Sequence, residues 1–189
     1  ILENMRDKIG RYKDRDRYLS VSLDIVDEMN QIVLEILSLS SVQELAGDKE
    51  WIQLDQVVEQ ILDQYKVLAQ SRALTIDNQI PDKAVYMDPA ILKLVLSNVI
   101  SNAVKHSDAG GEIQLRLEEE GTHLAVENTS QEMVETAEMP MTASRQKKEG
   151  GLGLFVVQHL LDHEELAYQF DKTAMGLRFR MELPKEPQE

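Results

Sequence analysis

Apolar residues recur three and four positions apart in the first part of the chain, a pattern typical of an amphipathic helix. It predicts a helix of about 28 residues that starts near Asp16, after a break at residues 10–14. The stripe consists of Ile25, Val26, Met29, Ile32, Val33, Ile36, Leu37 and Leu39. A stripe of this width suits a multi-helix bundle. We therefore expect residues 1–45 to form a helical arm that mediates self-association, with a helix packed on its own domain as the alternative.

From residue 46 onward the pattern changes to short strands and helices, which we expect to form one globular domain to residue 189. Strands are expected at residues 51–54, 74–78, 113–117, 124–128, 166–170 and 177–183. Amphipathic helices are expected at residues 57–69, from Pro89 to His106, and after Gly151. A Glu119-Glu120-Gly121 turn separates two of the strands. This order predicts an α+β fold, a two-layer sandwich in which helices cover one face of a mixed sheet.

The helix expected to end at His106 carries a polar row beside its apolar face. At 100° per residue, Asn98, Asn102 and Lys105 fall within a narrow arc. Amide oxygens suit a hard cation such as Mg²⁺, and a lysine suits the phosphates that accompany it. A partly buried helix with polar flanks explains the row equally well.

Glycines run directly into an apolar helical pattern at residues 150–161. Glycine lets the backbone approach an anion closely, and the free amides of a first helical turn point toward negative charge. The segment Gly151-Leu152-Gly153-Leu154 could therefore hold a phosphate. A tight loop that packs a helix onto a sheet gives the same pattern.

Together, in this order and with strands between them, the two motifs resemble the ATP-binding catalytic domain of sensor histidine kinases. That domain has the Bergerat-type fold of the gyrase, Hsp90, histidine kinase and MutL superfamily, and the resemblance covers nearly the whole chain. Residues 98–106 are similar to its asparagine box, residues 151–154 to the core of its second glycine box, and Asp88-Pro89 to the capped start of the helix.

The resemblance implies specific roles. Asn102 would hold Mg²⁺, Asn98 would lie beside the reacting phosphate, and Lys105 would contact phosphate, so Asn98 and Lys105 are the expected catalytic residues. The expected nucleotide-binding residues are Asn98, Asn102, Lys105, His106, Asn128, Gly151, Leu152, Gly153 and Leu154. For His106 a simple position at the helix end is equally compatible with the pattern.

The chain departs from the family at two places. The first glycine box reads Asn128-Thr-Ser-Gln-Glu132, so both of its glycines are missing and Asn128 stands where the family has an adenine-reading aspartate. Glu149 replaces the leading glycine of the second box, and the ATP lid lacks its phenylalanine. These departures make a degenerate binding or scaffolding module the alternative to an enzyme.

The resemblance also implies a reaction and partners. The family transfers the γ-phosphate of ATP to a histidine, which passes it to an aspartate of a response regulator. Residues 1–45 correspond to the end of the family's dimerisation and phosphotransfer hairpin, so we expect a homodimer through the arm. The whole protein would be attached to a membrane, with this portion in the cytoplasm. A dimer-clamp ATPase of the same superfamily is a further possibility, against which the hairpin argues.

The chain contains four histidines, at positions 106, 123, 159 and 163, and none lies in the sequence context of a phosphoaccepting histidine. The helical pattern of apolar residues already includes Ile1, so we expect most of the first hairpin helix to be missing. We therefore expect this fragment alone not to autophosphorylate. The net charge of −14 argues against a nucleic-acid partner. The absence of cysteine excludes disulfides and thiolate metal sites.

Overall fold

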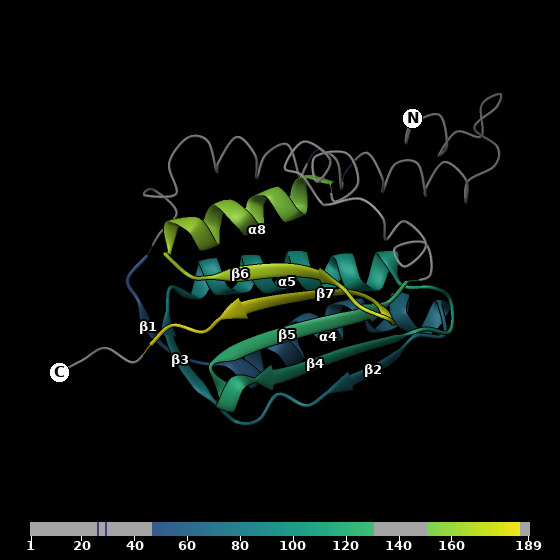
Figure 1. Ribbon diagram of the computed structural model, residues 1–189, viewed down its shortest axis with the longest axis horizontal. Helices are drawn as coiled ribbons and strands as arrows, with labels where there is room; N and C mark the ends of the chain where they lie inside the picture. The colour runs from purple at the N-terminus through teal and green to yellow at the C-terminus, as the bar shows by residue number, and fades with distance from the viewer. Residues whose placement is uncertain (1–25, 27–28, 30–46, 131–150, 186–189) are drawn as a thin grey trace, which may run out of the picture. The chain divides into compact units, whose positions relative to one another are not determined.

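The computed structural model describes residues 26, 29, 47–130 and 151–185 (Figure 1). Contacts divide the chain into two compact units, Ile1–Ser40 and Ser41–Glu189. In the first unit the structure describes Val26 and Met29, which are helical and 50% and 60% exposed. The predictions for the rest of the arm and for the lid, residues 131–150, lie outside the described residues. None of the described helices is both long and apolar enough to cross a membrane.

The second unit alternates strands and helices, as the sequence predicts. Its elements are β1 (Glu50–Gln53), α4 (Leu54–Ser71), β2 (Thr75–Asn78), β3 (Ala84–Met87), α5 (Pro89–His106), β4 (Glu112–Glu118), η2 (Glu119–Gly121), β5 (His123–Thr129), α8 (Gly151–His163), β6 (Tyr168–Lys172) and β7 (Gly176–Glu182). The strand expected at residues 51–54 ends one residue early, at Gln53, because α4 begins at Leu54. The side chain of Leu54 is fully buried. The periodicity did not reveal β3, which has only four residues.

The main sheet has the strand order β2-β4-β5-β7-β6. It is mixed, since β2 runs parallel to β4 and the other neighbours are antiparallel. A separate two-stranded antiparallel sheet joins β1 and β3. Figure 1 shows the helices on one side of the main sheet, where α5 packs against α4, α8 and β5. The α+β two-layer prediction is therefore confirmed.

Helix α5 begins as predicted at a cap formed by Asp88, which is 2% exposed. Its Oδ1 accepts hydrogen bonds from the backbone N–H groups of Ala90, at 2.7 Å, and Ile91, at 3.3 Å. Its Oδ2 accepts a hydrogen bond from the backbone N–H of Gly47. Pro89 occupies the first turn, where its missing N–H costs nothing. This carboxylate therefore fixes both the start of α5 and the segment that leads into β1.

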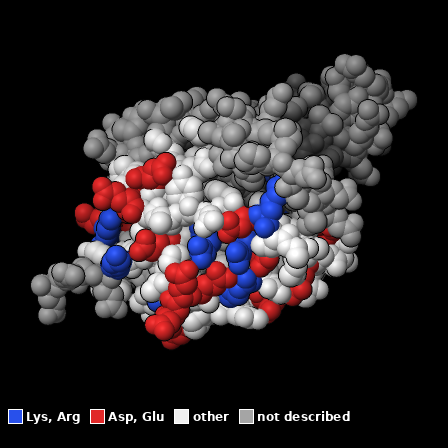
Figure 2. Space-filling model, viewed as in Figure 1, with Lys and Arg blue, Asp and Glu red and all other residues white. Residues whose placement is uncertain are grey.

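Alternation along the strands separates an apolar face, turned toward the helices, from a charged outer face. Figure 2 shows basic and acidic side chains interspersed on the visible side of the molecule. Arg116 of β4 contacts Glu127 of β5 at 3.0 Å, and Arg178 of β7 contacts Asp171 of β6 at 3.3 Å. The charges of this outer face are thus largely paired with one another, and the helix side holds the core.

Candidate functional site

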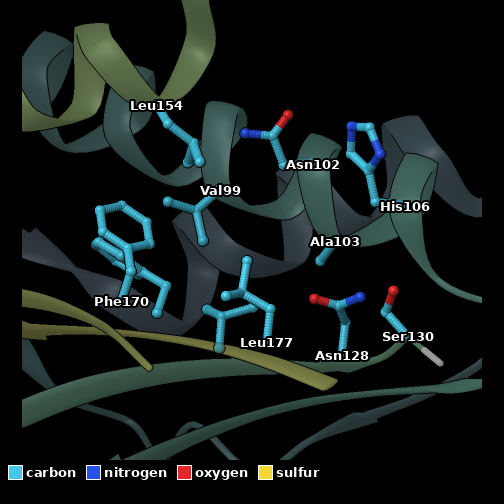
Figure 3. A pocket seen from close by; sticks show the side chains of 11 residues that line it. Val99, Asn102, Ala103, His106, Asn128, Ser130, Leu154, Phe170 and Leu177 are labelled. Carbon is cyan, nitrogen blue, oxygen red and sulfur yellow. The ribbon is translucent and has the colours of Figure 1, made fainter. Parts of the chain in front are cut away.

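A pocket lies between α5, the start of α8 and the inner face of strands β5, β7 and β6 (Figure 3). It is lined by Val99, Asn102, Ala103, His106, Val126, Asn128, Ser130, Leu154, Phe170, Leu177 and Phe179. Its walls are mostly apolar, and its polar groups are two α5 side chains and two side chains at the end of β5. An apolar slot with a few converging polar groups is the usual form of a small-molecule site.

The two asparagines of α5 lie against the start of α8. Asn98 donates a hydrogen bond from Nδ2 to the carbonyl of Leu94 at 2.8 Å, which fixes its side chain. A Cβ added to Gly153 would come within 2.8 Å of Asn98 Oδ1 and 3.6 Å of Asn102 Nδ2. The structure therefore brings the two sequence motifs together, and a side chain at position 153 would have to displace the tip of the Asn98 side chain.

Asn102 has an amide that suits a ligand. Its Nδ2 is buried and has no hydrogen-bond partner among the described residues. A buried amide group without a partner costs free energy, so contact with a bound molecule would be favourable. An amide supplies an oxygen ligand of the kind that Mg²⁺ takes. Since the described residues contain no cluster of three His, Cys, Asp or Glu side chains that could hold a metal, a cation here would rely on amide and phosphate oxygens.

Lys105 and His106 form the last turn of α5, and both are exposed. His106 lines the pocket, whereas Lys105 lies outside its lining. His106 therefore borders the pocket, and Lys105 precedes it in the same turn as an exposed, flexible cation outside the lining.

Asn128 lies near the end of β5 and Ser130 follows directly after the strand, and they are 6% and 4% exposed. The backbone of Asn128 pairs with Ile113 of β4 and Leu177 of β7. Gly176 of β7 packs so closely that an added Cβ would lie 2.5 Å from the backbone N of Ser130 and would overlap the carbonyl of Asn128. The position of this strand end is therefore fixed by the sheet.

The four glycine-box residues 151–154 belong to the first turn of α8. Gly153 and Leu154 are buried, and Leu154 lines the pocket. The unpaired backbone N–H groups of a first turn carry partial positive charge, so this helix end favours an anion. Glu149, Glu132 and the basic residues 145–148 lie outside the described residues.

The remaining histidines lie away from this pocket. His123 is close to Glu119, at 3.1 Å. His159 is exposed and stacks on Phe155, with ring centroids 6.4 Å apart, and His163 lies 3.5 Å from Glu164. His159 and His163 both lie on an exposed face of α8.

The sequence pattern alone did not identify part of the lining. Ser130, Phe170, Leu177 and Phe179 were not expected at the site, although the last three lie in expected strands. The alternation of Val126, Asn128 and Ser130 is a signal that could have placed Ser130 on the inner face. The contribution of β6 and β7 depends on the strand order, which periodicity does not reveal.

Comparison with known proteins gives concordant matches. The family described as Histidine kinase-, DNA gyrase B-, and HSP90-like ATPase matches residues 87–187. The chain is 33% identical over 192 residues to the sensor histidine protein kinase HK06 of Streptococcus pneumoniae, covering 97% of this chain and 43% of the relative. It is 31% identical over 198 residues to the sensor protein VanSB of Enterococcus faecalis, covering 97% and 44%. The chain therefore spans less than half the length of these relatives.

Solved structures agree on the fold. The catalytic domain of histidine kinase ThkA matches with a TM-score of 0.62 at 19% identity, over 75% of this chain and 100% of that chain. The structure of ThkA in complex with the response regulator protein TrrA matches with a TM-score of 0.71 at 18% identity, over 98% of this chain and 55% of that chain.

Proposed function

Because this chain belongs to the histidine kinase-, DNA gyrase B- and HSP90-like ATPase family, we propose that it is the catalytic portion of a sensor histidine kinase. In this proposal it binds Mg-ATP and directs the γ-phosphate to a histidine, from which the phosphate passes to an aspartate of a response regulator. The observation that carries the proposal is the apposition of Asn98 and Asn102 with Gly153 beside an apolar slot. The apolar slot suits the base, the helix N-terminus suits the phosphates, and the amide pair suits the Mg²⁺ that accompanies them.

Each part of the site then has a role. Asn128 contacts the edge of the base, while apolar residues such as Val126 and Phe179 enclose its faces. Asn102 offers an amide oxygen to Mg²⁺, which when bound offsets the phosphate charge. Asn98 lies beside the reacting phosphate, and Lys105 and the amides of residues 151–154 hold the phosphate chain. No side chain need act as a strong base, because a neutral imidazole already presents a nucleophilic nitrogen.

The rest of the proposal concerns the whole protein. Residues 1–45 would be the end of a dimerisation hairpin, followed by the catalytic domain in residues 46–189. The apolar stripe of the arm, in which Val26 and Met29 are exposed, supports a homodimer. The ThkA structure contains a response regulator, which supports a partner of that class here. By analogy with the sensor relatives, the full protein would be attached to a membrane and this portion would lie in the cytoplasm.

Calorimetry with ATP and Mg²⁺ tests the site. Asn102→Ala should weaken Mg-ATP binding at least tenfold, because the amide oxygen is lost. The same substitution should weaken the binding of metal-free ATP by a smaller factor. Lys105→Ala should also weaken binding. Lys93→Ala removes an exposed cation from another face of α5 and is the matched control, which should bind normally. An unchanged affinity of Asn102→Ala for Mg-ATP would contradict the proposal that Asn102 is a ligand of Mg²⁺.

Labelled ATP tests the reaction. The chain mixed with Mg-ATP and a histidine-kinase hairpin that carries a phosphoaccepting histidine should transfer label to that hairpin. The chain alone should not acquire acid-labile phosphate, since none of its four histidines has the context of an acceptor. Nucleotide binding without transfer to any hairpin, in trans or in cis, would favour a scaffolding module.

A further inference from the structure

We propose that the pocket accepts nucleotides of 6-oxo purines as well as those of 6-amino purines. The groups responsible are the Asn128 amide and the Ser130 hydroxyl, which together form the polar end of the pocket. The inference rests on the proposed function, because it requires that this slot hold the base of a nucleotide.

The two side chains are held in place side by side. Residues two apart on a strand point to the same face, and Figure 3 shows Asn128 and Ser130 both rising from the strand end toward α5. Pairing of Asn128 with Leu177 fixes the backbone, and the N–H of Ser130 donates to the carbonyl of Met175 at 3.0 Å. The polar groups can therefore rotate about their side-chain bonds, but they cannot withdraw from the pocket.

Neither polar group forms a hydrogen bond to another side chain or to the backbone within the described part of the chain. The neighbouring residues of the same strand differ in this respect. Glu127 accepts a hydrogen bond from Arg116 at 3.0 Å, and Thr129 Oγ1 both accepts from and donates to the backbone of Glu112. Asn128 and Ser130 have no such bond to another described residue, although both are nearly fully buried and line the pocket. Among the described residues, none sets the orientation of these two polar groups, so a bound base can set it.

The chemistry of these groups makes them compatible with two base edges. A 6-amino purine presents a donor at N6 and an acceptor at N1, and a 6-oxo purine presents an acceptor at O6 and a donor at N1. An amide carries one donor group and one acceptor, so turning its plane over matches either edge, and a hydroxyl can likewise donate or accept. An ionised carboxylate only accepts. With the Ser130 hydroxyl opposite N1, a carboxylate at position 128 would accept from the N6 amino group of a 6-amino purine but would meet O6 of a 6-oxo purine without a donor. Asn128 therefore removes the discrimination that an aspartate at this position would impose.

Titration calorimetry with ATP and ITP tests the inference, because the two nucleotides differ only at this edge of the base. The parent chain should bind ITP within about tenfold of ATP. Asn128→Asp should keep ATP binding and weaken ITP, so that the ratio of the two dissociation constants rises by at least about tenfold. Gln60→Glu adds the same charge at an exposed position of α4 and should leave the ratio unchanged.

Two results would overturn the inference alone: a parent that binds ATP but not ITP, or an Asn128→Asp chain with an unaltered ratio. If Asn128→Asp loses both nucleotides, Asn128→Ala decides. Parallel weakening of ATP and ITP supports the shared contact, and weakening of ATP alone overturns it. A parent that binds neither nucleotide would overturn the proposed function as well, which separates the two failures.

Discussion

Gly153 lies directly against Asn98, so that a Cβ at position 153 would come within 2.8 Å of the asparagine Oδ1. The hydrogen bond from Asn98 Nδ2 to Leu94 holds that oxygen in place. Two motifs that are distant in sequence therefore form one surface, on which the start of α8 closes over the asparagine row of α5. A side chain at position 153 would therefore displace Asn98 Oδ1 from this position.

The first prediction concerns this contact. Gly153→Ala should destabilise the domain by about 1–3 kcal/mol, because the added methyl group overpacks the interface between the helices. It should also weaken Mg-ATP binding, since either Asn98 Oδ1 or the start of α8 must shift. Urea denaturation measures the first effect and calorimetry the second. In an Asn98→Ala background the same substitution should cost much less stability, and an equal cost in both backgrounds would contradict the proposed clash.

A second prediction concerns Asp88, whose two carboxylate oxygens serve different partners. Asp88→Ala should cost about 1–2 kcal/mol of unfolding free energy, because the cap of α5 is lost. Asp88→Asn should cost less, since an asparagine caps a helix as well as an aspartate does. Only one amide oxygen can accept, so the amide of Gly47 should exchange with solvent faster in both variants. Equal stability of the alanine and asparagine variants would contradict this role of the cap.

A third prediction concerns the charged outer face. Burial alone would raise the pKa of Glu127, but hydrogen bonds from Thr173 and Arg116 and the charges of Arg116 and Arg178 lower it below its ordinary value of 4.5. Because the folded-state pKa is the lower one, this carboxylate stabilises the fold fully above the ordinary value. The contribution falls as the pH drops through the folded-state pKa.

Glu127→Gln should accordingly reduce the unfolding free energy by roughly 1–2 kcal/mol at neutral pH, and the difference from the parent should shrink in acid. Denaturation curves at several pH values measure it. Glu59→Gln, at an exposed position of α4, controls for the loss of one charge. A difference that stays constant down to pH 3 would show that the Glu127 ion pairs do not cause the shift.

The sequence predicted helices and strands well where the apolar period extends over many residues. The eighteen residues of α5 carry a clear apolar stripe, a capping aspartate and a proline in the first turn, and all three appear in the structure. The α+β order of the domain was likewise readable, because alternation marks β4, β5 and β7. Strand β3 was missed, because its four residues are too few to show the alternation of apolar and polar positions.

The site was predicted only in part, for a physical reason. Of the residues that their motifs led us to expect at a nucleotide site, Asn102, His106, Asn128 and Leu154 line the pocket. Phe170 lines it as well, because the sheet places β7 next to β5 and β6 next to β7. Strand order and close packing, such as that of Gly176 on Asn128, arise from tertiary structure and leave no local period in the sequence.

Backbone amide NMR during addition of ATP, first without and then with Mg²⁺, tests most directly that this pocket holds Mg-ATP. We predict that the largest shift changes fall on the second half of α5, the end of β5 and the start of α8, and that Mg²⁺ further shifts the side-chain amide of Asn102. In Asn102→Ala the changes that require Mg²⁺ should disappear from α5. Shift changes gathered on the outer face around Arg116 and Arg178, or none at millimolar ATP, would contradict the account.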